Sequence, residues 1–575
     1  MKPDDTRKPD DAQAPARIDP ITLEVVRNKL EGIANEMQTT LLHSAFSPIV
    51  KEGMDCSASL FTADAQTIAQ ATAIPIHLAT MIPALEAVIA KFGIAAMAPG
   101  DVYILNDPYC GGTHLPDITL FVPVFADDVV VAFSVATVHH QDVGGMAPGS
   151  IPTNATEIYQ EGLRIPPLRY IRDGVVDPAL EALLRYNIRL PDTFIGDLNA
   201  QLAACRVGAR RLGELCAAYG SATIVRIFAE LLDRSEAMTR AALRRLPAGT
   251  YRYVDWLDND GIELDRRVRI EVAATVRDGT IHFDFTGTEG QLRGPLNCVP
   301  SGAYAAAYYA VRALTDAQIP TNGGCFRPVT LHLPVGSLVN PQPPAAVNAR
   351  TATIKRICGA MIGAFAEAVP DRVPAAPAGL SVMLAFGGRR ADGTSFIVSE
   401  LVCGGTGASA RADGVDCLQT DGTNSMNLPV EALSIDAPIR VLRFGLRPDS
   451  GGAGRQRGGL GVIREYMFDA DDIRFTFRGE RHFTAARGSA GGGDGAMTRA
   501  TIHRADGRVE PISKCVTTVS RGDRLVLETA GGGGYGNPAE RAAAAAAEDR
   551  ANRKVGGGDR TGHDRNDDGS HGGSR

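Results

Sequence analysis

Apolar residues recur at every third or fourth position near the start of the chain, which is the spacing of one face of an amphipathic helix. The residues that follow this spacing are Val26, Leu30, Ile33, Met37 and Leu41. Asp19 followed by Pro20 is a typical helix start, because aspartate caps a first turn and proline suits the first helical position. Similar patterns predict further helices at residues 82–92, 178–246 (mainly 197–215 and 224–246), 301–314 and 352–368.

Two neighbouring stretches, residues 118–125 and 129–138, are rich in β-branched and aromatic residues. Ala126, Asp127 and Asp128 lie between them as a short turn, so the pattern predicts a β-hairpin. β-Structure is also predicted at residues 251–285, at 329–339 and in the Gly-rich region 387–536. Helices and strands do not alternate regularly, which favours an α+β fold over a doubly wound parallel sheet.

The 575 residues are too many for one compact core, so we expect several packed regions. An N-terminal α+β region with the hairpin is predicted at residues 19–250 and a central α+β region at 251–430. A Gly-rich, mostly β region is predicted at 431–537. Residues 1–18 are predicted to be a disordered arm, and residues 538–575 a short helix (538–550) followed by a disordered, low-complexity tail.

Composition excludes several classes of protein. The net charge is −7 and no basic stripe stands out, so we expect no nucleic-acid partner. The N-terminal segment lacks an apolar signal core, and no apolar run reaches the roughly 18 residues of a membrane span. We therefore expect a cytoplasmic protein with no membrane partner. The ten cysteines contain no C-x-x-C pair, which favours scattered, reduced thiols over a zinc ribbon or a disulfide framework.

The strongest candidate for chemistry lies at the open end of the predicted hairpin. His114 and Asp117 precede its first strand, and His139 ends its second. The predicted turn centres near Asp127, so the numbers of two paired residues should sum to about 254. Asp117 then faces position 137 and His139 faces position 115, so Asp117 and His139 are about 7 Å from direct pairing along the strand. Two imidazoles and a carboxylate placed in this way suit a first-row divalent metal such as zinc, manganese or iron.

The alternation of side chains along a strand distinguishes His139 from His140. Because consecutive strand residues point to opposite faces, His139 and His140 cannot both be ligands if the strand continues through them. We favour His139 as the ligand, with His140 or Asp142 as a residue that orients a ligand or carries a proton. Each of these motifs alone is common and usually structural. Glu52, His77, Glu157 and Glu161 are, taken singly, more typical of caps or surface positions.

Two Gly-rich segments suggest anion binding. Residues 531–536 satisfy G-x-G-x-x-G, but no acidic residue follows at dinucleotide spacing and no G-K-[ST] is present. A structural turn is the favoured interpretation. Residues 449–459 contain two arginines among glycines and could bind an anion, although a loop packed on a sheet is favoured there too.

Six sequence elements together carry a family resemblance. They are residues 106–117, 139–145, 161–167, 320–328, 449–461 and 531–537. In this combination the chain resembles the hydantoinase B/oxoprolinase family over residues 19–537. The family includes the B subunit of ATP-dependent N-methylhydantoinase, the C-terminal half of 5-oxoprolinase, and subunits of acetone and acetophenone carboxylases.

The resemblance implies a partner, the A-type subunit, which has an actin-like ATPase fold and binds ATP. The partner would phosphorylate the carbonyl oxygen of a lactam or hydantoin, and this chain would direct water to the activated carbonyl. The implied metal ligands are His114, Asp117 and His139 with Glu52 as an addition, and we assign catalytic roles to His140, Asp142 and Glu161. The alternatives are a subunit of an ATP-dependent ketone carboxylase, disfavoured by the lack of large insertions, and a non-catalytic scaffold.

Overall fold

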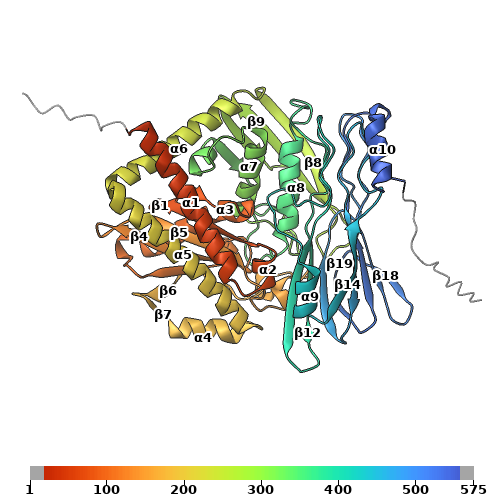
Figure 1. Cartoon of the computed structure of the whole chain (residues 1–575), viewed down its shortest axis with the longest axis horizontal. Helices are drawn as coiled ribbons and strands as arrows, with labels where there is room; N and C mark the ends of the chain where they lie inside the picture. The colour runs from red at the N-terminus through yellow and green to blue at the C-terminus, as the bar shows by residue number, and fades with distance from the viewer. Residues whose placement is uncertain (1–17, 557–575) are drawn as a thin grey trace, which may run out of the picture.

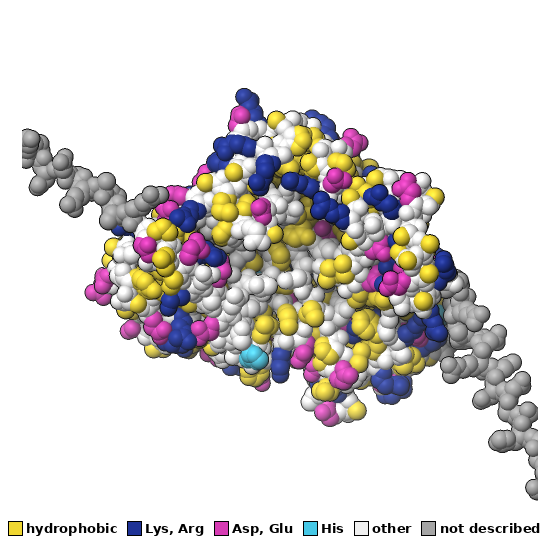
Figure 2. Space-filling model, turned by 45° about the horizontal axis from the view of Figure 1, so that its top comes forward, with side chains coloured by type: hydrophobic (Ala, Val, Ile, Leu, Met, Phe, Trp, Pro, Cys, Tyr) yellow, Lys and Arg dark blue, Asp and Glu magenta, His cyan; other side chains and the backbone are white. Residues whose placement is uncertain are grey.

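The computed structural model describes residues 18–556, so the predicted disordered arm and tail lie almost entirely outside the described residues. Within these bounds the chain is α+β, with four sheets and helices packed around them (Figure 1). Charged side chains of both signs are interspersed with uncharged surface on the face shown in Figure 2.

The first sheet has seven antiparallel strands in the order β2-β1-β5-β4-β3-β6-β7. Their bounds are β1 Cys56–Thr62, β2 Thr67–Gln70, β3 Val102–Leu105, β4 Asp117–Ala126, β5 Val129–His139, β6 Leu168–Arg172 and β7 Val175–Val176. Its two central strands, β4 and β5, are the predicted hairpin. They are buried on both faces, as their nearly continuous apolar sequence requires.

The hairpin turn is one residue shorter than predicted. Ala126 pairs with Val129, which leaves Asp127 and Asp128 as a two-residue turn, and both have left-handed φ angles, 51° and 60°. A β-bulge between Val124 and Phe125 shifts the register by one further residue. Asp117 therefore pairs directly with His139 and not with position 137 as predicted.

Helices cover both faces of this sheet. On one face lie α1 (Pro20–Ser44) and α5 (Pro191–Tyr219), which also pack on each other (Figure 1). Asp19 caps α1 as predicted, since its side chain accepts from the Thr22 N–H. The whole predicted stripe of α1 is buried. Helices α2 (Pro48–Lys51), α4 (Pro178–Asn187) and α6 (Ser221–Leu243) complete this part of the chain.

The opposite face is covered by α3 (Pro75–Phe92), where Met81 and Leu85 pack with the aromatic rings of Phe61, Phe121 and Phe133. The helix begins seven residues earlier than predicted and continues through Pro83, because its contacts with the sheet and α7 stabilise it despite the missing N–H.

By length and composition alone, α3 is long and apolar enough to cross a membrane, and 50% of its apolar window is buried inside the protein. The bent pair of α5 and α6 meets the same criterion of length and composition when the two helices are taken together.

The second sheet runs β11-β10-β9-β8. Its strands are β8 Gly249–Leu257, β9 Val268–Arg277, β10 Thr280–Asp284 and β11 Val329–His332. Helices α7 (Pro300–Leu314) and α8 (Arg350–Gly363) pack on each other, and α8 packs on the sheet. The predicted strand at 329–339 and helix at 352–368 are present with shorter or shifted bounds.

The Gly-rich part of the chain forms two sheets with a shared apolar core. One is β13-β12-β16-β19, made of β12 Val382–Arg389, β13 Ser395–Val402, β16 Ile473–Arg478 and β19 Lys514–Val519. The other is β14-β15-β20-β17-β18, made of β14 Ile439–Leu446, β15 Val462–Phe468, β17 Arg499–His503, β18 Val509–Pro511 and β20 Arg524–Glu528. The first of these sheets joins strands from both sides of residue 430, where the sequence predicted a boundary.

Two short helices complete the C-terminal part. Helix α9 (Val430–Asp436) was not predicted. Helix α10 (Ala543–Ala551) is shorter than predicted, because Arg541 is extended and separates it from a single 3-10 turn. It lies at the outer edge of the molecule (Figure 1), where Asp549 is buried in ion pairs with Arg457 and Arg541.

Candidate metal centre

Three neighbouring strands place acidic and imidazole side chains in one row. Asp117 at the start of β4 lies directly across from His139 at the end of β5. On the other side of β5, the pairing of Cys56 with Val138 continues to Asp55, whose carbonyl accepts from the His139 N–H. Residues directly opposite in neighbouring strands project to the same face. The ends of β1, β5 and β4 therefore present Asp55, His139 and Asp117 side by side.

His114 reaches this row from the loop that leads into β4. Its Nδ1 lies 3.1 Å from the Asn348 carbonyl oxygen, so Nδ1–H donates there and Nε2 carries the lone pair. Its Nε2 lies 3.1 Å from Asp117 Oδ1, and its ring centroid lies 5.1 Å from that of His139. The ligand atoms of His114, Asp117 and His139 all lie within 4.8 Å of one another.

Several polar atoms of this cluster are buried without a hydrogen-bond partner among the described residues. They are His114 Nε2, Asp117 Oδ1 and both ring nitrogens of His139. Buried polar atoms without partners are costly, and two acceptors facing each other at 3.1 Å also repel. A cation between them removes both penalties. The donor set of two imidazole nitrogens and a carboxylate oxygen is one that divalent transition metals favour.

The charges around the cluster keep its donors in the ligand form. Burial, followed by the Arg350 guanidinium, lowers the pKa of His114 to about 3, and burial lowers the pKa of His139 to about 3. Both rings are therefore neutral at physiological pH. Burial alone would raise the pKa of Asp117, but His114 and Arg350 outweigh it and hold that pKa well below its usual range. Arg350 Nη2 lies 2.5 Å from Asp117 Oδ2.

His77 of α3 adds a third imidazole that the sequence interpretation left aside. Its Nε2 lies 3.5 Å from both Asp55 Oδ1 and Asp117 Oδ1. Burial lowers the pKa of His77, but Asp117 more than compensates and raises it. The ring is therefore placed to hold a proton between two carboxylates.

The cluster opens into a small pocket of about 40 Å³. The pocket is lined by residues from all parts of the chain: Asp55 and His77, His114 and His139, Arg350 and Thr351 of α8, Met383 of β12, Thr423 and Ser425, and Arg478 and Glu480 after β16. No single region therefore builds this site.

Of the residues assigned catalytic roles, His140 lies on the opposite face of the sheet. Its Nε2 lies 2.9 Å from Gln201 Oε1, and its ring packs 4.4 Å from that of Phe194 on α5. The reason is the alternation of strand side chains, which turns His140 away when His139 faces the cluster. The structure thus does not bring His140 to the site.

Asp142 and Glu161 are engaged in loop structure. Asp142 accepts from the backbone N–H groups of Gly144 and Gly149 and pairs with Arg189 Nη1 at 2.7 Å. Glu161 accepts from the N–H groups of Val347 and Asn348. Glu161 thus holds the segment whose carbonyl orients His114, so its position supports a positioning role and not contact with a reacting group.

Glu52 follows helix α2 and does not line the pocket. The further carboxylate beside the cluster belongs to Asp55, which precedes β1 and whose backbone carbonyl accepts from the His139 N–H. Sequence reasoning missed Asp55, Arg350 and Arg478, since each reaches the cluster through pairing between segments distant in the chain. For His77 the only signal was a polar residue in an apolar stretch.

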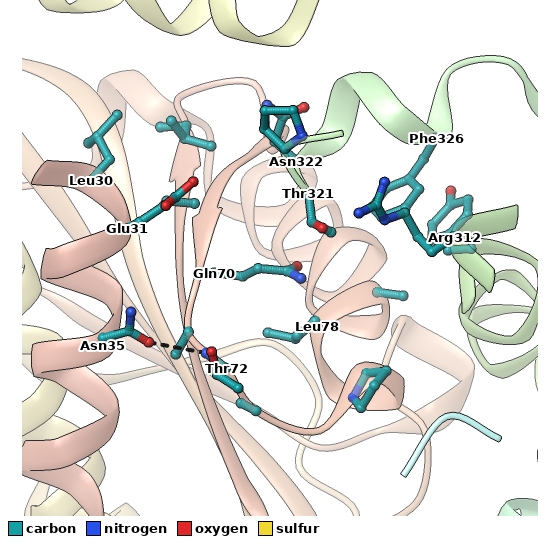
Figure 3. Close-up of a pocket in the computed structure, with 18 of the residues that line it drawn as sticks. Leu30, Glu31, Asn35, Gln70, Thr72, Leu78, Arg312, Thr321, Asn322 and Phe326 are labelled. Carbon is teal, nitrogen blue, oxygen red and sulfur yellow. Dashed lines mark hydrogen bonds between the residues drawn. The ribbon is translucent and has the colours of Figure 1, made fainter. Parts of the chain in front are cut away.

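A larger cavity of about 440 Å³ lies beyond the first turn of α3 (Figure 3). Gln70 of β2 and Thr321 extend into it, and Leu78, Asn322 and Phe326 form part of its wall (Figure 3). Its described lining is mostly amides, hydroxyls and apolar groups, and the metal-binding donor set lies in the smaller pocket. We therefore place the candidate site in the smaller pocket.

The Gly-rich segment 531–536 has no N–H groups left for a phosphate. Each N–H from Gly531 to Gly536 donates to a backbone carbonyl, among them those of Gly459 and Gly493. A Cβ added at Gly532 would lie 1.9 Å from the Thr406 carbonyl oxygen. The segment is closely packed, as the structural interpretation predicted. In the other Gly-rich loop, residues 449–459, Arg457 pairs with Asp416 and Asp549. The guanidinium group of Arg457 is therefore already paired with carboxylates of the protein.

Comparison with known proteins identifies relatives over most of the chain. The sequence profile described as hydantoinase B/oxoprolinase matches residues 19–538. An uncharacterized protein of Methanocaldococcus jannaschii is 36% identical over 528 residues, covering 91% of this chain and 92% of that protein. A caprolactamase subunit beta of Pseudomonas jessenii is 33% identical, covering 91% and 92%. The 5-oxoprolinase of Dictyostelium discoideum is 30% identical and covers 90% of this chain, which spans 40% of that longer protein.

Solved structures show the same fold. The crystal structure of ATP-dependent caprolactamase from Pseudomonas jessenii matches with a TM-score of 0.86 and 31% identity, over 94% of each chain. The nucleotide-free structure of acetone carboxylase matches with a TM-score of 0.87 over 93% of this chain and 78% of that one. Its sequence identity is 21%, so this second likeness concerns the fold alone.

Proposed function

The chain belongs to the hydantoinase B/oxoprolinase family, and from this premise we propose that it is the B-type subunit of an ATP-dependent cyclic amidohydrolase. The proposed substrate is a lactam or cyclic imide whose carbonyl oxygen is phosphorylated by a partner A-type subunit that binds ATP. Water then adds to the carbonyl carbon, and the ring C–N bond breaks as the nitrogen takes a proton, which leaves an acyl phosphate. A second water hydrolyses the acyl phosphate to the carboxylate and free phosphate. The names of the relatives, caprolactamase subunit beta and 5-oxoprolinase, support this assignment.

The observation that carries the site assignment is the pair of facing acceptors, His114 Nε2 and Asp117 Oδ1, which lie 3.1 Å apart and have no hydrogen-bond partner among residues 18–556. With His139, these residues would hold a divalent ion, and Asp55 lies beside them as a further carboxylate. Such an ion would supply Lewis acidity to the carbonyl and favour deprotonation of water.

The protein's own residues have defined tasks in this proposal. Asn348 and Glu161 fix the ring of His114, and Arg350 fixes one oxygen of Asp117. His77 Nε2 is placed to take the proton that water loses, since two carboxylates stabilise its charged form.

Elemental analysis of the purified protein tests the metal assignment. We expect near-stoichiometric divalent metal in the wild type, and its loss in His114→Ala. The matched control is His332→Ala, which removes an exposed imidazole at the end of β11 and should leave the metal content unchanged. Equal metal content in all three proteins would contradict the assignment.

Activity is tested with the A-type subunit present. The two subunits are purified together and assayed for ATP-dependent opening of 5-oxoproline, hydantoins and caprolactam, with ketones plus bicarbonate as the other arm. Ring opening that His114→Ala abolishes supports the proposal. Carboxylation of a ketone without ring opening would replace it with the carboxylase function.

A further inference from the structure

The same pocket holds two guanidinium groups that metal binding does not require. Arg350 and Arg478 both line it, and only 4% and 6% of their surfaces are exposed. Burying an arginine is costly unless an anion accompanies it. Arg350 has such a partner in Asp117, whereas Arg478 donates hydrogen bonds to the backbone and side-chain oxygens of Asn348.

Arg350 also has donor capacity left over. Its Nη2 serves Asp117 and its Nη1 serves Thr351, but its Nε is buried without a hydrogen-bond partner among the described residues. Arg350 begins α8, and Thr351 and Ala352 of the same first turn line the pocket. A helix N-terminus carries partial positive charge, so the unsatisfied donor and the helix end favour an anion at the same place.

The charges of the pocket give the charge of that anion. Arg350 and Arg478 balance Asp55 and Asp117, and Glu480 is balanced by Lys514 at 2.5 Å. His114 and His139 are counted as neutral ligands, and His77 is counted as the neutral base that has not yet taken up a proton. With a divalent ion in the His114–Asp117–His139 cluster the pocket has two positive charges in excess, which a dianion neutralises. The pocket volume of about 40 Å³ matches roughly three water molecules, a small oxyanion group and not a ring.

We propose that Arg350, Arg478 and the first turn of α8 form an oxyanion site that receives the phosphoryl group of the activated cyclic amide. This inference rests on the proposed function, because it takes the phosphorylated substrate from it. The two guanidiniums hold the phosphoryl group while the cluster faces the carbonyl carbon whose oxygen carries that group. They also stabilise the phosphate as it leaves, since guanidinium forms strong charge-assisted hydrogen bonds to phosphate oxygens.

Arg478 is the residue to change, because Arg350 also holds Asp117. Arg478 has a structural task as well: its Nη1 donates to the Asn348 carbonyl and side-chain oxygens, and that carbonyl orients His114. A purely structural role would therefore appear as a loss of metal. An oxyanion role appears as a loss of phosphate binding at unchanged metal content.

The experiment measures binding of inorganic phosphate to the purified full chain by titration calorimetry, with metal content determined on the same samples. We expect Arg478→Gln to weaken phosphate binding about tenfold or more, and Arg478→Lys to weaken it less, because lysine keeps the charge without the planar fork. Arg474→Gln, on the exposed side of the same strand β16, is the control and should bind like the wild type.

Three outcomes would overturn the proposal: phosphate binding that Arg478→Gln leaves unchanged, phosphate binding lost in proportion to metal in Arg478→Lys, or binding of bicarbonate or acetate in place of phosphate. The result also separates the two proposals. A wild type without metal that still binds phosphate through Arg478 would contradict the metal assignment and keep the oxyanion site.

Discussion

Asp117 divides its two carboxylate oxygens between two tasks. Oδ2 receives hydrogen bonds from Thr113 and Arg350, and Oδ1 faces the unpartnered nitrogen of His114. A carboxylate whose other oxygen is held in this way cannot rotate, so an ion bound at Oδ1 would be fixed in place. The residues that surround the cluster are therefore as important to its geometry as the ligands.

Glu161 gives a testable pH dependence at the residue scale. Burial raises its pKa to about 8 from an ordinary value of 4.5. Between these values the folded protein holds a proton that the unfolded chain has released, so stability decreases as pH rises through this window. Glu161→Gln should remove this contribution and flatten the pH dependence of the melting temperature between pH 5 and 8. Parallel curves for wild type and variant would contradict this account.

The sequence predicted the cluster only where its residues are close along the chain. His114, Asp117 and His139 meet because one hairpin joins them, and the alternation that turns His140 away is a local rule. Asp55 depends on the pairing of β1 with β5, and Arg350 and Arg478 depend on packing of distant regions. No spacing in a single sequence records such contacts, so these residues could not be predicted.

At the scale of elements, the hairpin turn determines which residues face each other at the metal centre. A one-residue change in register moves a side chain to the other face of a sheet. The predicted and observed registers differ by two residues, through the shorter turn and the bulge, so the predicted faces were correct although the partners were not.

The turn also predicts a stabilising substitution. Asp128 has a φ of 60°, a conformation that favours glycine at the second position of a type I′ turn. Asp128→Gly should raise stability by up to about 1 kcal/mol, measured by thermal unfolding. Asp128→Val at the same site is the opposite control and should destabilise by about 1–2 kcal/mol. A lower melting temperature for Asp128→Gly would show that the side chain has a role of its own.

Buried ion pairs attach helix α10 to the rest of the protein. Asp549 is 6% exposed and pairs with Arg457 at 3.3 Å and Arg541 at 2.6 Å. Removing one partner of a buried ion pair typically costs about 3–5 kcal/mol. Asp549→Ala should therefore release α10, seen as fast amide hydrogen exchange over residues 543–551. Glu548→Ala, at the exposed neighbouring position, should leave exchange slow; equal protection in both variants would show that apolar contacts hold the helix.

At the scale of the whole molecule, the candidate metal centre is built from residues of several parts of the fold. Asp55 and His139 come from the first sheet, Arg350 from the helix on the second, and Arg478 from the third. A ligand that binds only the folded state stabilises it, by about 2.7 kcal/mol at a hundredfold excess over its dissociation constant. Metal removal by a chelator should therefore lower the melting temperature of the wild type and leave that of His114→Ala unchanged. A chelator effect of equal size on both would place the metal elsewhere.

The closed Gly-rich segment leads to a prediction about ATP. Because every N–H from Gly531 to Gly536 is already used within the protein, this segment cannot cradle phosphates. We expect the isolated chain to show no ATP turnover in a phosphate-release assay, and turnover only with the A-type subunit. ATP hydrolysis by the purified chain alone, unaffected by removal of contaminants, would contradict this.

The architecture as a whole was predictable in part. Strong periodicity identified α1, the hairpin and the helices between residues 178 and 246. The glycine-rich region could be assigned to β-structure, but its division into two sheets could not be predicted, since β12 pairs with β16 across more than eighty residues. Non-local strand pairing carries no local signature, and the same property hides the contributions of Arg350 and Arg478 to the site.

The dependence of His114 on Asn348 and Arg478 also sets an order of events during synthesis. Once residue 139 has been synthesised, the nascent chain contains both imidazoles and the carboxylate of the cluster. The carbonyl that turns His114 and the guanidinium that holds that carbonyl follow several hundred residues later, roughly tens of seconds at ordinary translation speed. Until then the nascent chain contains the imidazoles and the carboxylate, but not the contacts that fix the orientation of His114. A shaped centre that could select a metal therefore forms only after synthesis has passed Arg478.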